Sequence, residues 1–358
     1  MTHGIPPRYK PTGDVLTGGT GEVLICQDNI LERKVAIKFI QDIKDKRRLL
    51  DEIKALQKIR SKHVVQIFDV LINTNNDNRR IGIVEEYVSG DDLTSFIKGK
   101  TLSIDEYLET LYQIASAISD IHDQGLIHRD IKPNNIKFDI SKIIKIFDFG
   151  LARSSGENDS TLGFVGTREF AAPELYRAGT VPFTSAVDTY AFGVTAWYLS
   201  GIQIPKALSE IPPNITNIPS FSSLPLKIPD PIIKLLDSTL IEYPSNRPLM
   251  SEIRDILKNH LLKDKHRALL THGSNTYILK KTKPLVKLDV QNHGSIHVRY
   301  DGLNFLVDFV SGAVSINNQP ARLYQILPKS CVITLGDSSR GAKRMFVTFD
   351  ISNPEVVL

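Results

Sequence analysis

The sequence predicts an α+β chain of two domains, in which a mixed α and β region is followed by a smaller all-β region. With 358 residues, the chain is longer than a single hydrophobic core usually organises. Hydrophobic residues make up 41% of it, which is enough to build large cores. Short alternating apolar and polar runs begin and end the chain, whereas helical spacing dominates its middle.

The first 90 residues read as a mostly β segment with one helix. Residues 13–40 alternate around a glycine cluster, which predicts strand, turn and strand. Two further strands are predicted over residues 64–72 and 81–88. Residues 43–60 are charged and carry apolar residues at helical spacing, so we expect a helix there.

The helical character begins near residue 93. Helices are predicted over residues 103–123, 186–199, 231–240 and 250–262, with Ser103 as the N-cap of the first. Short strands are expected at residues 136–138 and 143–146, before a long loop that runs to about residue 183.

A basic linker, residues 263–271, precedes the all-β region of residues 272–358. Turn residues there separate short strand-like runs, and no helix is expected. The predicted strands are residues 277–279, 285–290, 295–300, 305–308, 314–316, 332–335 and 345–350.

Charge and cysteine content narrow the setting of the protein. A net charge of +4 is too mild to indicate nucleic acid or a membrane surface. The two cysteines, Cys26 and Cys331, are typical of reduced thiols in a cytosolic protein. The most apolar stretch, residues 190–201, is too short to span a bilayer. We therefore expect a soluble cytoplasmic protein without a membrane anchor or a nucleic-acid partner.

Two motifs near the N-terminus could contact phosphate groups. Glycines in residues 18–23 would let backbone N–H groups approach phosphate oxygens, although such clusters more often form plain hairpins. Lys38 follows Val35, Ala36 and Ile37 on a predicted strand, where an inward lysine would need an anion. Taken alone, it is more often a surface lysine. Glu52 lies in the next helix and could pair with it.

Two later motifs decide the resemblance. They are residues 128–135, His-Arg-Asp-Ile-Lys-Pro-Asn-Asn, and residues 148–150, Asp-Phe-Gly. With the glycine cluster, Lys38 and Glu52, they resemble the protein kinase signature in its expected order. Residues 166–174, Asp188, Gly193 and Arg247 also resemble kinase features. The resemblance covers residues 9–262 and implies a bilobal kinase fold, with an N-lobe over 9–88 and a C-lobe over 89–262.

The resemblance assigns roles to individual residues. It implies that Lys38 holds the ATP phosphates and is oriented by Glu52, and that Asp130 accepts the hydroxyl proton while Lys132 supports the γ-phosphate. Asn135 and Asp148 would bind Mg²⁺ or Mn²⁺. The nucleotide contacts it implies are Leu16, Gly18, Gly19, Thr20, Gly21, Val23, Ala36, Lys38, Glu86, Val88, Asn135 and Asp148.

Acceptor choice and activation also follow from the resemblance. Lys132 and Thr167 match the pattern of kinases that phosphorylate serine or threonine in proteins. The motifs, including residues 128–135, are similar in sequence to those of eukaryotic-like kinases of bacteria. Arg129 suggests a phosphorylated activation loop within residues 151–165. The candidate phosphosites are Ser154, Ser155, Ser160 and Thr161, with Ser160 and Thr161 nearest the expected position. The alternative is that all four are ordinary polar loop residues.

Three departures from the kinase pattern stand out. Leu16 replaces the first glycine of the loop, and the spacing from Lys38 to Glu52 is short. Glu85 falls just before the predicted hinge, Glu86 to Val88, where an apolar residue or threonine is usual. A carboxyl there would narrow the back pocket or pair with a base, unless the alignment is shifted by one residue.

The C-terminal region resembles part of a forkhead-associated domain, an 11-stranded β-sandwich that binds phosphothreonine. The resemblance rests on residues 294–300, 305–308, 314–319 and 333–336. The family's serine–arginine–x–x–histidine spacing is absent. Arg299, Ser295 and Lys329 are candidate phosphopeptide ligands. An unrelated β module that binds or regulates protein partners is the alternative, as is docking onto the phosphorylated activation loop.

Three function classes remain open from the sequence. They are an active serine/threonine protein kinase, a kinase-like scaffold without activity, and a kinase of small molecules. Lys38, Glu52, Asp130, Asn135 and Asp148 are all present, which favours an active enzyme over a scaffold. Lys132 and residues 166–174 favour protein acceptors over small molecules.

Overall fold

A computed structural model describes residues 5–18, 21–40, 53–54, 56–72, 81–148, 153–154, 168–176 and 184–352. The chain divides into two compact units, Met1–Leu257 and Lys258–Leu358. Each unit has its own hydrophobic core, and they are described separately.

A five-stranded antiparallel sheet forms the first lobe of unit 1, in the order β1-β2-β3-β5-β4. The strands are β1 (Tyr9–Gly18), β2 (Gly21–Asp28), β3 (Arg33–Ile40), β4 (Ile67–Ile72) and β5 (Ile81–Glu86). β4 begins three residues later than predicted, because Val64 instead forms an isolated bridge with Ile146. The predicted helix over residues 43–60 falls mostly outside the described residues.

Successive residues of β3 face opposite sides of this sheet. Val35 and Ile37 pack into a buried cluster with Val84 of β5. Their neighbours Ala36 and Lys38 therefore point to the other face, because side chains alternate along a strand. The register pairs Lys38 with Ile83 and Ala36 with Glu85, so all four residues share that second face.

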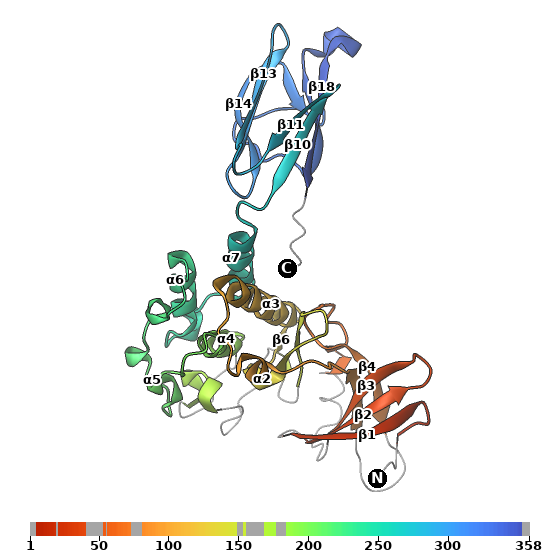
Figure 1. The fold of residues 1–358 in the computed structure, drawn as a ribbon, viewed down its shortest axis with the longest axis vertical. Coiled ribbons are helices and arrows are strands. Elements are labelled where there is room, and N and C mark those ends of the chain that lie inside the picture. The colour runs from red at the N-terminus through yellow and green to blue at the C-terminus, as the bar shows by residue number, and fades with distance from the viewer. Residues whose placement is uncertain are drawn as a thin grey trace. The chain divides into compact units, whose positions relative to one another are not determined.

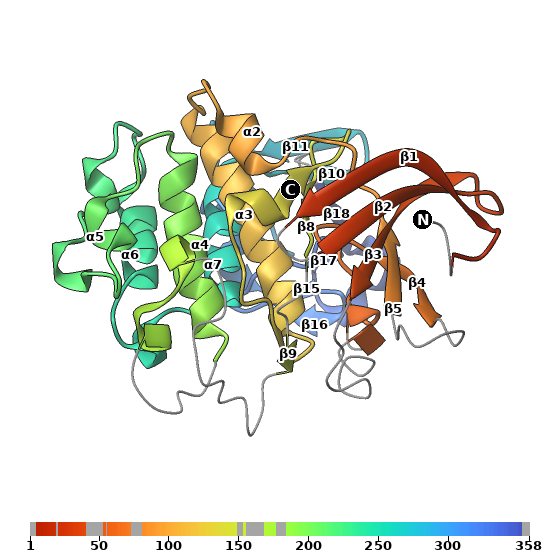
Figure 2. The same ribbon diagram turned by 90° about the horizontal axis from the view of Figure 1, so that it is seen from below.

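Helices build the second lobe of unit 1 (Figure 2). They are α2 (Leu93–Ile97), α3 (Ile104–His122), α4 (Ala186–Leu199), α5 (Lys206–Ser209), α6 (Asp230–Thr239) and α7 (Met250–Leu262). Ser103 caps α3 as predicted, in a capping box with Glu106. α4 is buried almost throughout, which explains its nearly continuous apolar sequence. No helix in the described part of the chain is both long and apolar enough to cross a membrane.

Short strands between α3 and α4 carry the loops of interest. β6 (Leu126–Ile127) pairs with β9 (Arg153–Ser154), and β7 (Ile136–Phe138) pairs with β8 (Ile144–Ile146). A 3₁₀ turn, η1 (Pro133–Asn135), joins the loop after β6 to β7. Two more such turns, η3 (Arg168–Phe170) and η4 (Pro173–Tyr176), precede α4.

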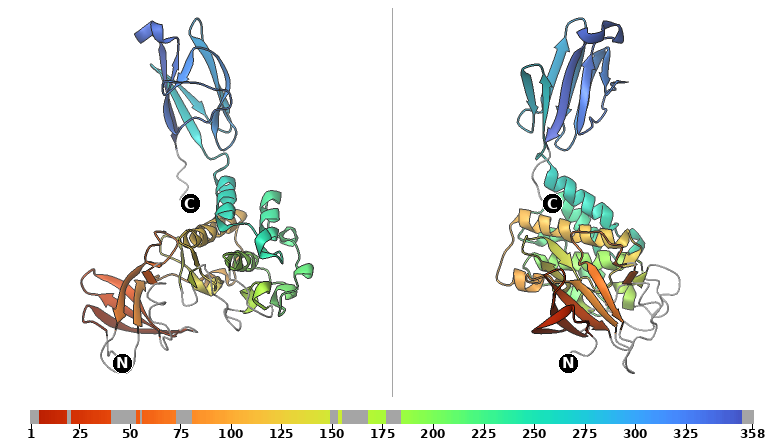
Figure 3. Two further views of the ribbon diagram at one scale, coloured as in Figure 1. Left: turned by 180° about the vertical axis from the view of Figure 1, so that it is seen from behind. Right: turned by 90° about the vertical axis from the view of Figure 1, so that its right-hand side faces the viewer.

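Unit 2 is a sandwich of two antiparallel sheets (Figures 1 and 3). One sheet has the order β11-β10-β18-β17-β15-β16 and the other β12-β13-β14. The strands are β10 (Arg267–His272), β11 (Asn275–Leu279), β12 (Leu285–Val290), β13 (Gly294–Tyr300), β14 (Phe305–Gly312), β15 (Val314–Ile316), β16 (Gln319–Pro320), β17 (Ser330–Leu335) and β18 (Met345–Ser352). Both sheets contribute buried residues to one core.

Two features of unit 2 differ from the sequence prediction. The expectation of no helix was wrong, because a 3₁₀ segment, η8 (Ser338–Lys343), follows the Asp337 cap between β17 and β18. All of β10 except His272 lies within the predicted linker, since Ala268 and Leu270 alternate into the core in a run too short to recognise. The nine strands described here are fewer than the eleven that the forkhead-associated resemblance implies.

Candidate active site

A lysine and an aspartate from the two lobes of unit 1 meet where the lobes adjoin, a region that we call the cleft. Lys38 lies on β3 and is buried, and its Nζ donates to the Oδ1 of Asp148, which follows β8. Burial of a lysine is costly unless an anion lies beside it, and Asp148 is that anion here. The cleft therefore holds one fixed positive and one fixed negative group.

A second cluster gathers around the carboxylate of Asp130. Lys132 Nζ donates to Asp130 Oδ2 at 2.7 Å, and Asn135 Nδ2 donates to the same oxygen at 2.8 Å. Asn135 Nδ2 also lies 2.8 Å from the Asp130 carbonyl oxygen, so the amide connects to both the side chain and the backbone of Asp130 in the loop after β6. Asp130 is 7% exposed, and a buried carboxylate with two donors is oriented rather than free to rotate.

Asp188 of α4 anchors this loop through its backbone. Its two carboxylate oxygens accept from the N–H groups of His128 and Arg129, each at 2.8 Å, and His122 Nε2 lies 2.9 Å away. Burial alone would raise the pKa of Asp188, but these hydrogen bonds and nearby histidines hold the pKa below its ordinary value. Arg129 adopts φ 69°, a conformation that costs free energy and that Asp188 holds in place.

His128 connects the loop to the segment that carries Asp148. Its Nδ1 accepts from the Asp130 N–H at 3.3 Å, so its Nε2 is the donor to the Phe147 carbonyl at 3.1 Å. Burial lowers the pKa of His128, which suits this neutral form. The Phe147 N–H donates in turn to the Asn135 carbonyl at 3.0 Å, so both backbone groups next to Asp148 are fixed by the loop.

Two adjacent carboxylates at the end of β5 point to opposite faces. Glu86 pairs with the buried Lys145 of β8 at 2.8 Å and accepts from the Gln66 N–H at 3.2 Å. Glu85 lies on the face of Lys38 and is half-buried. Burial raises the pKa of Glu85 to about 7; the Lys38 charge opposes this shift and Asp148 adds to it.

A buried ion pair stabilises the base of the helical lobe. Arg247 donates to both carboxylate oxygens of Glu174, at 2.7 and 2.8 Å. It also donates to the carbonyl groups of Ala186, Ile241 and Glu242, so η4, the start of α4 and the turn after α6 are joined at one guanidinium. This geometry satisfies Arg247 fully, as burial requires.

Comparison with known proteins agrees with this arrangement. Residues 9–266 match the family described as "Protein kinase domain", which is well over half of the chain. The chain belongs to that family. Its kinase domain thus combines the sheet lobe, the Lys38–Asp148 contact and the Asp130 loop in one unit.

Several named kinases are similar to the chain. A probable serine/threonine-protein kinase of Clostridium acetobutylicum is 30% identical over 79% of this chain and 44% of its own length. A serine/threonine-protein kinase of Corynebacterium efficiens is 33% identical over 55% of this chain and 39% of its own. Mitogen-activated protein kinase 10 of Arabidopsis thaliana is 33% identical over 53% and 49%. The chain therefore spans less than half the length of these relatives.

The donor set near the kinase cleft fits a hard divalent cation. Asp148 offers carboxylate oxygens, and the Oδ1 of Asn135 remains an acceptor because its Nδ2 donates to Asp130. Oxygen ligands of this kind are what Mg²⁺ and Mn²⁺ prefer. The backbone hydrogen bond from Phe147 to Asn135 holds these two segments side by side.

Some predicted site residues lie outside the described part of the chain. They are Glu52, Gly19, Thr20, Ser155, Ser160 and Thr161. Four others are described only as strand backbone. Three lie in the β1–β2 hairpin, Leu16, Gly18 and Gly21, and the fourth is Ser154 in β9. The predicted contacts Val23, Ala36, Glu86 and Val88 lie on β2, β3, β5 and the segment after β5.

Lys145 is a site residue that sequence reasoning missed. A lysine between Ile144 and Ile146 reads as the exposed position of an alternating strand, yet it is 8% exposed. Its partner Glu86 lies 59 residues away, so only the fold brings the two charges together.

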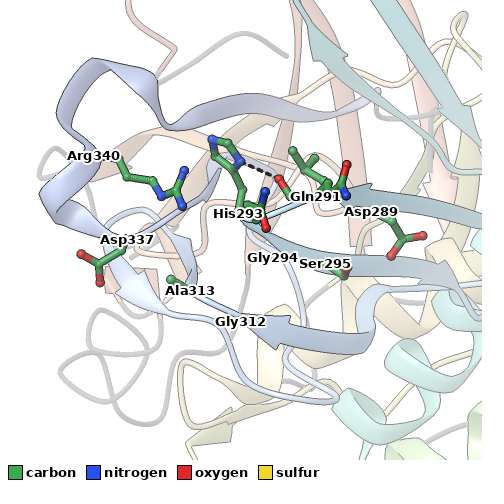
Figure 4. A pocket seen from close by; sticks show the side chains of 11 residues that line it. Asp289, Gln291, His293, Gly294, Ser295, Gly312, Ala313, Asp337 and Arg340 are labelled. Carbon is green, nitrogen blue, oxygen red and sulfur yellow. Dashed lines mark hydrogen bonds between the residues drawn. The ribbon is translucent and has the colours of Figure 1, made fainter.

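A second candidate site is a cavity of about 670 Å³ in unit 2, lined by the β12–β13 turn, the β14–β15 junction and η8. Figure 4 shows Arg340 and Asp289 at opposite ends of the lining, with His293 between them. His293 is held at 3.0 Å from both the Gln291 and the Lys343 carbonyls. Among the described residues, no hydrogen bond or ion pair engages the Arg340 guanidinium.

The three candidate phosphopeptide ligands do not converge. Ser295 lines the cavity, but Arg299 lies further along β13 and pairs with Asp308 at 2.6 Å. Lys329 precedes β17, whose opposite end leads to the cavity.

Proposed function

We propose that this chain is a serine/threonine protein kinase that transfers the γ-phosphoryl group of ATP to protein hydroxyls. The arrangement of Asp130 carries the proposal: a buried carboxylate oriented by Lys132 and Asn135, on a loop fixed by Asp188. Family membership and the serine/threonine kinases among its relatives support it. Phosphoryl transfer depends on positioning and charge neutralisation, and this cleft supplies both.

Each group in the cleft has a defined task in this proposal. Asp130 accepts a hydrogen bond from the acceptor hydroxyl and takes its proton as the phosphoryl group leaves ATP. Lys132, now 2.7 Å from Asp130, provides positive charge for the transferred group. Lys38 would exchange its contact with Asp148 for the α- and β-phosphates, and Asn135 and Asp148 would hold a divalent cation. That cation, when bound, neutralises charge on the phosphate oxygens.

We further propose that the kinase phosphorylates its own activation loop. Arg129 precedes Asp130, and an anion in the loop would have a cationic partner there. Ser160 and Thr161 are the favoured acceptors, followed by Ser154 and Ser155. The loop residues Ser160 and Thr161 lie outside the described residues, so the support comes from the sequence.

A phosphotransfer assay tests both statements. Wild type and Asp130→Asn are incubated with Mg²⁺, ATP and a generic protein, and phosphosites are mapped by mass spectrometry. We expect serine or threonine phosphorylation in wild type only, including Ser160 or Thr161. Transfer that is equal in Asp130→Asn, or its absence from wild type, would overturn the kinase proposal. Activity without loop phosphorylation would overturn the second statement alone.

The β domain is proposed to bind a protein partner or to regulate the kinase. The cavity at η8 supports this, because Arg340 offers a guanidinium suited to a carboxylate or phosphate group. Fluorescence anisotropy with phosphothreonine and unphosphorylated loop peptides tests it, with Arg340→Ala as the variant. Binding that needs the phosphate and Arg340 supports a phosphopeptide partner. Binding that needs neither supports a different protein contact.

A further inference from the structure

We propose that Glu85 determines the choice of base in the nucleotide, favouring adenine over guanine. The inference rests on the proposed kinase function, since it concerns the same cleft. It adds a specificity role to a residue that departs from the kinase sequence pattern.

The strand register places Glu85 between two parts of the cleft. Ala36 is its direct partner on β3, and Lys38 is the diagonal neighbour on the same face. Directly opposed Cβ atoms in such pairs lie roughly 5 Å apart, and diagonal ones roughly 7–8 Å apart. Glu85 is followed at once by Glu86 to Val88, the expected hinge. Its carboxyl group thus sits between the base end and the phosphate end.

Ala36, the direct partner of Glu85, has a small side chain and offers no hydrogen-bond donor from it. By contrast, Glu86 is turned away from the cleft and is satisfied by Lys145 and Gln66. No hydrogen bond or ion pair joins the Glu85 carboxyl to another residue within the described part of the chain. A half-buried carboxyl group without a hydrogen-bond partner is partly desolvated, so a donor on a ligand would be favoured there.

Adenine and guanine differ in the group they could present to Glu85. Adenine carries an amine, a donor, at the position where guanine carries a carbonyl oxygen, an acceptor. An ionised carboxylate only accepts hydrogen bonds. The Glu85 carboxylate would accept a hydrogen bond from the adenine amine. It would repel the guanine oxygen, because the two acceptors would face each other without a hydrogen between them. A mismatch of this kind changes the ratio of kcat/KM for the two nucleotides by about 10- to 100-fold.

The protonation state of Glu85 sets the conditions for the test. Burial raises the pKa of Glu85 to about 7, even though the Lys38 charge opposes the shift. A protonated carboxyl could donate to the guanine oxygen and would weaken the discrimination. Measurements at about pH 8 keep most of the carboxylate ionised.

The experiment compares kcat/KM for Mg²⁺-ATP and Mg²⁺-GTP in the full chain at about pH 8. Wild type is expected to favour ATP by at least about 10-fold. Glu85→Gln introduces an amide that can donate as well as accept, so the ratio should fall by about 10-fold. Glu86→Gln removes the adjacent carboxylate on the other face and should change both nucleotides by the same factor.

Two results would overturn the inference: an ATP/GTP ratio in Glu85→Gln within about two-fold of wild type, or an equal fall in Glu86→Gln. If wild type transfers phosphate from neither nucleotide, the proposed function fails. The inference is then decided by calorimetric Kd values for ATP and GTP, which give the same ratio without turnover. Equal melting temperatures show that the variants fold.

Discussion

Arg247 and Glu174 lie 73 residues apart in the sequence and form a bidentate ion pair inside the helical lobe. The side chains are 0% and 4% exposed, so removal of either leaves a buried, uncompensated charge or donor set. We expect Glu174→Gln or Arg247→Met to lower the free energy of unfolding by about 3–5 kcal/mol. Urea denaturation measures this, and the double variant Glu174→Leu/Arg247→Met should lose less than the sum.

The pair of Arg254 with Asp255 provides the matched control. Its aspartate is 59% exposed, so Asp255→Asn should cost less than about 1 kcal/mol. Equal losses at the two pairs would contradict the buried role of Glu174.

Asp188 should act on turnover rather than on nucleotide affinity. Asp188→Asn replaces one acceptor oxygen by a donor that faces N–H groups of the Asp130 loop. We expect kcat to fall by about 10- to 100-fold while the KM for ATP changes little, since Lys38 and the hinge are untouched. Steady-state kinetics decides it. A rise in KM at constant kcat would show that the anchor serves nucleotide binding instead.

His63 should make the kinase unit sensitive to acid. Its Nδ1 lies 3.2 Å from the Ile144 carbonyl, and burial, aided by the Lys62 charge, lowers its pKa to about 4. The unfolded chain binds this proton near pH 6.5, so stability is constant above that pH and falls as pH drops towards 4. The full loss is about 3 kcal/mol.

Comparison of wild type with His63→Gln isolates this contribution. The difference in free energy of unfolding between them should shrink by about 3 kcal/mol from neutral pH to about pH 4. A difference that is constant with pH would show that His63 is protonated in the folded protein or stays exposed.

The Glu86–Lys145 pair should hold the hinge in place for the nucleotide. Lys145 belongs to β8, three residues before Asp148, so the pair connects the end of β5 to the strand that leads to Asp148. We expect Lys145→Met to raise the KM for ATP by about 3- to 10-fold with a smaller effect on kcat. The charge swap Glu86→Lys/Lys145→Glu should recover part of the affinity.

A similar pair in the β domain provides the control for this effect. Asp308→Asn breaks the Arg299–Asp308 pair, which lies in the other unit and should leave the KM for ATP unchanged. An unchanged KM in Lys145→Met would show that the hinge is positioned by its backbone alone.

Gly193 allows α4 and α6 to pack closely. A Cβ at this position would lie 2.1 Å from Thr239 Oγ1 and 2.8 Å from Leu240 Cδ2. Gly193→Ala should therefore destabilise the kinase unit by about 1–3 kcal/mol, seen as a lower melting temperature. Thr239→Ala added to it should relieve part of the clash. Full stability in the single variant would mean that the helices separate at no cost.

Long helices with clear caps were predictable from sequence. α4 and α7 have the predicted bounds, and α3 differs by one residue at each end, because apolar spacing and the Ser103 cap define them locally. β10 and η8 were not predicted. The burial of Ala268 and Leu270 depends on pairing with β18, far along the chain, and no local pattern reports that.

The chemistry-bearing residues were recognisable through their order along the chain, and their roles stay predictions. The sequence could not indicate which charged side chains pair with one another. Lys38 and Asp148 are 110 residues apart, and Glu86 meets Lys145 across 59. Pairings across such separations depend on the packing of the two lobes, which composition and spacing do not contain.

The first and last strands of the β domain run side by side, with Arg267 opposite Ser352. The cavity lies beyond the other ends of the strands, where β17 leads through η8 into β18. Entry and exit of the chain are thus adjacent and distant from the cavity. Such a domain could be inserted into another protein through a single attachment point, with the cavity left uncovered.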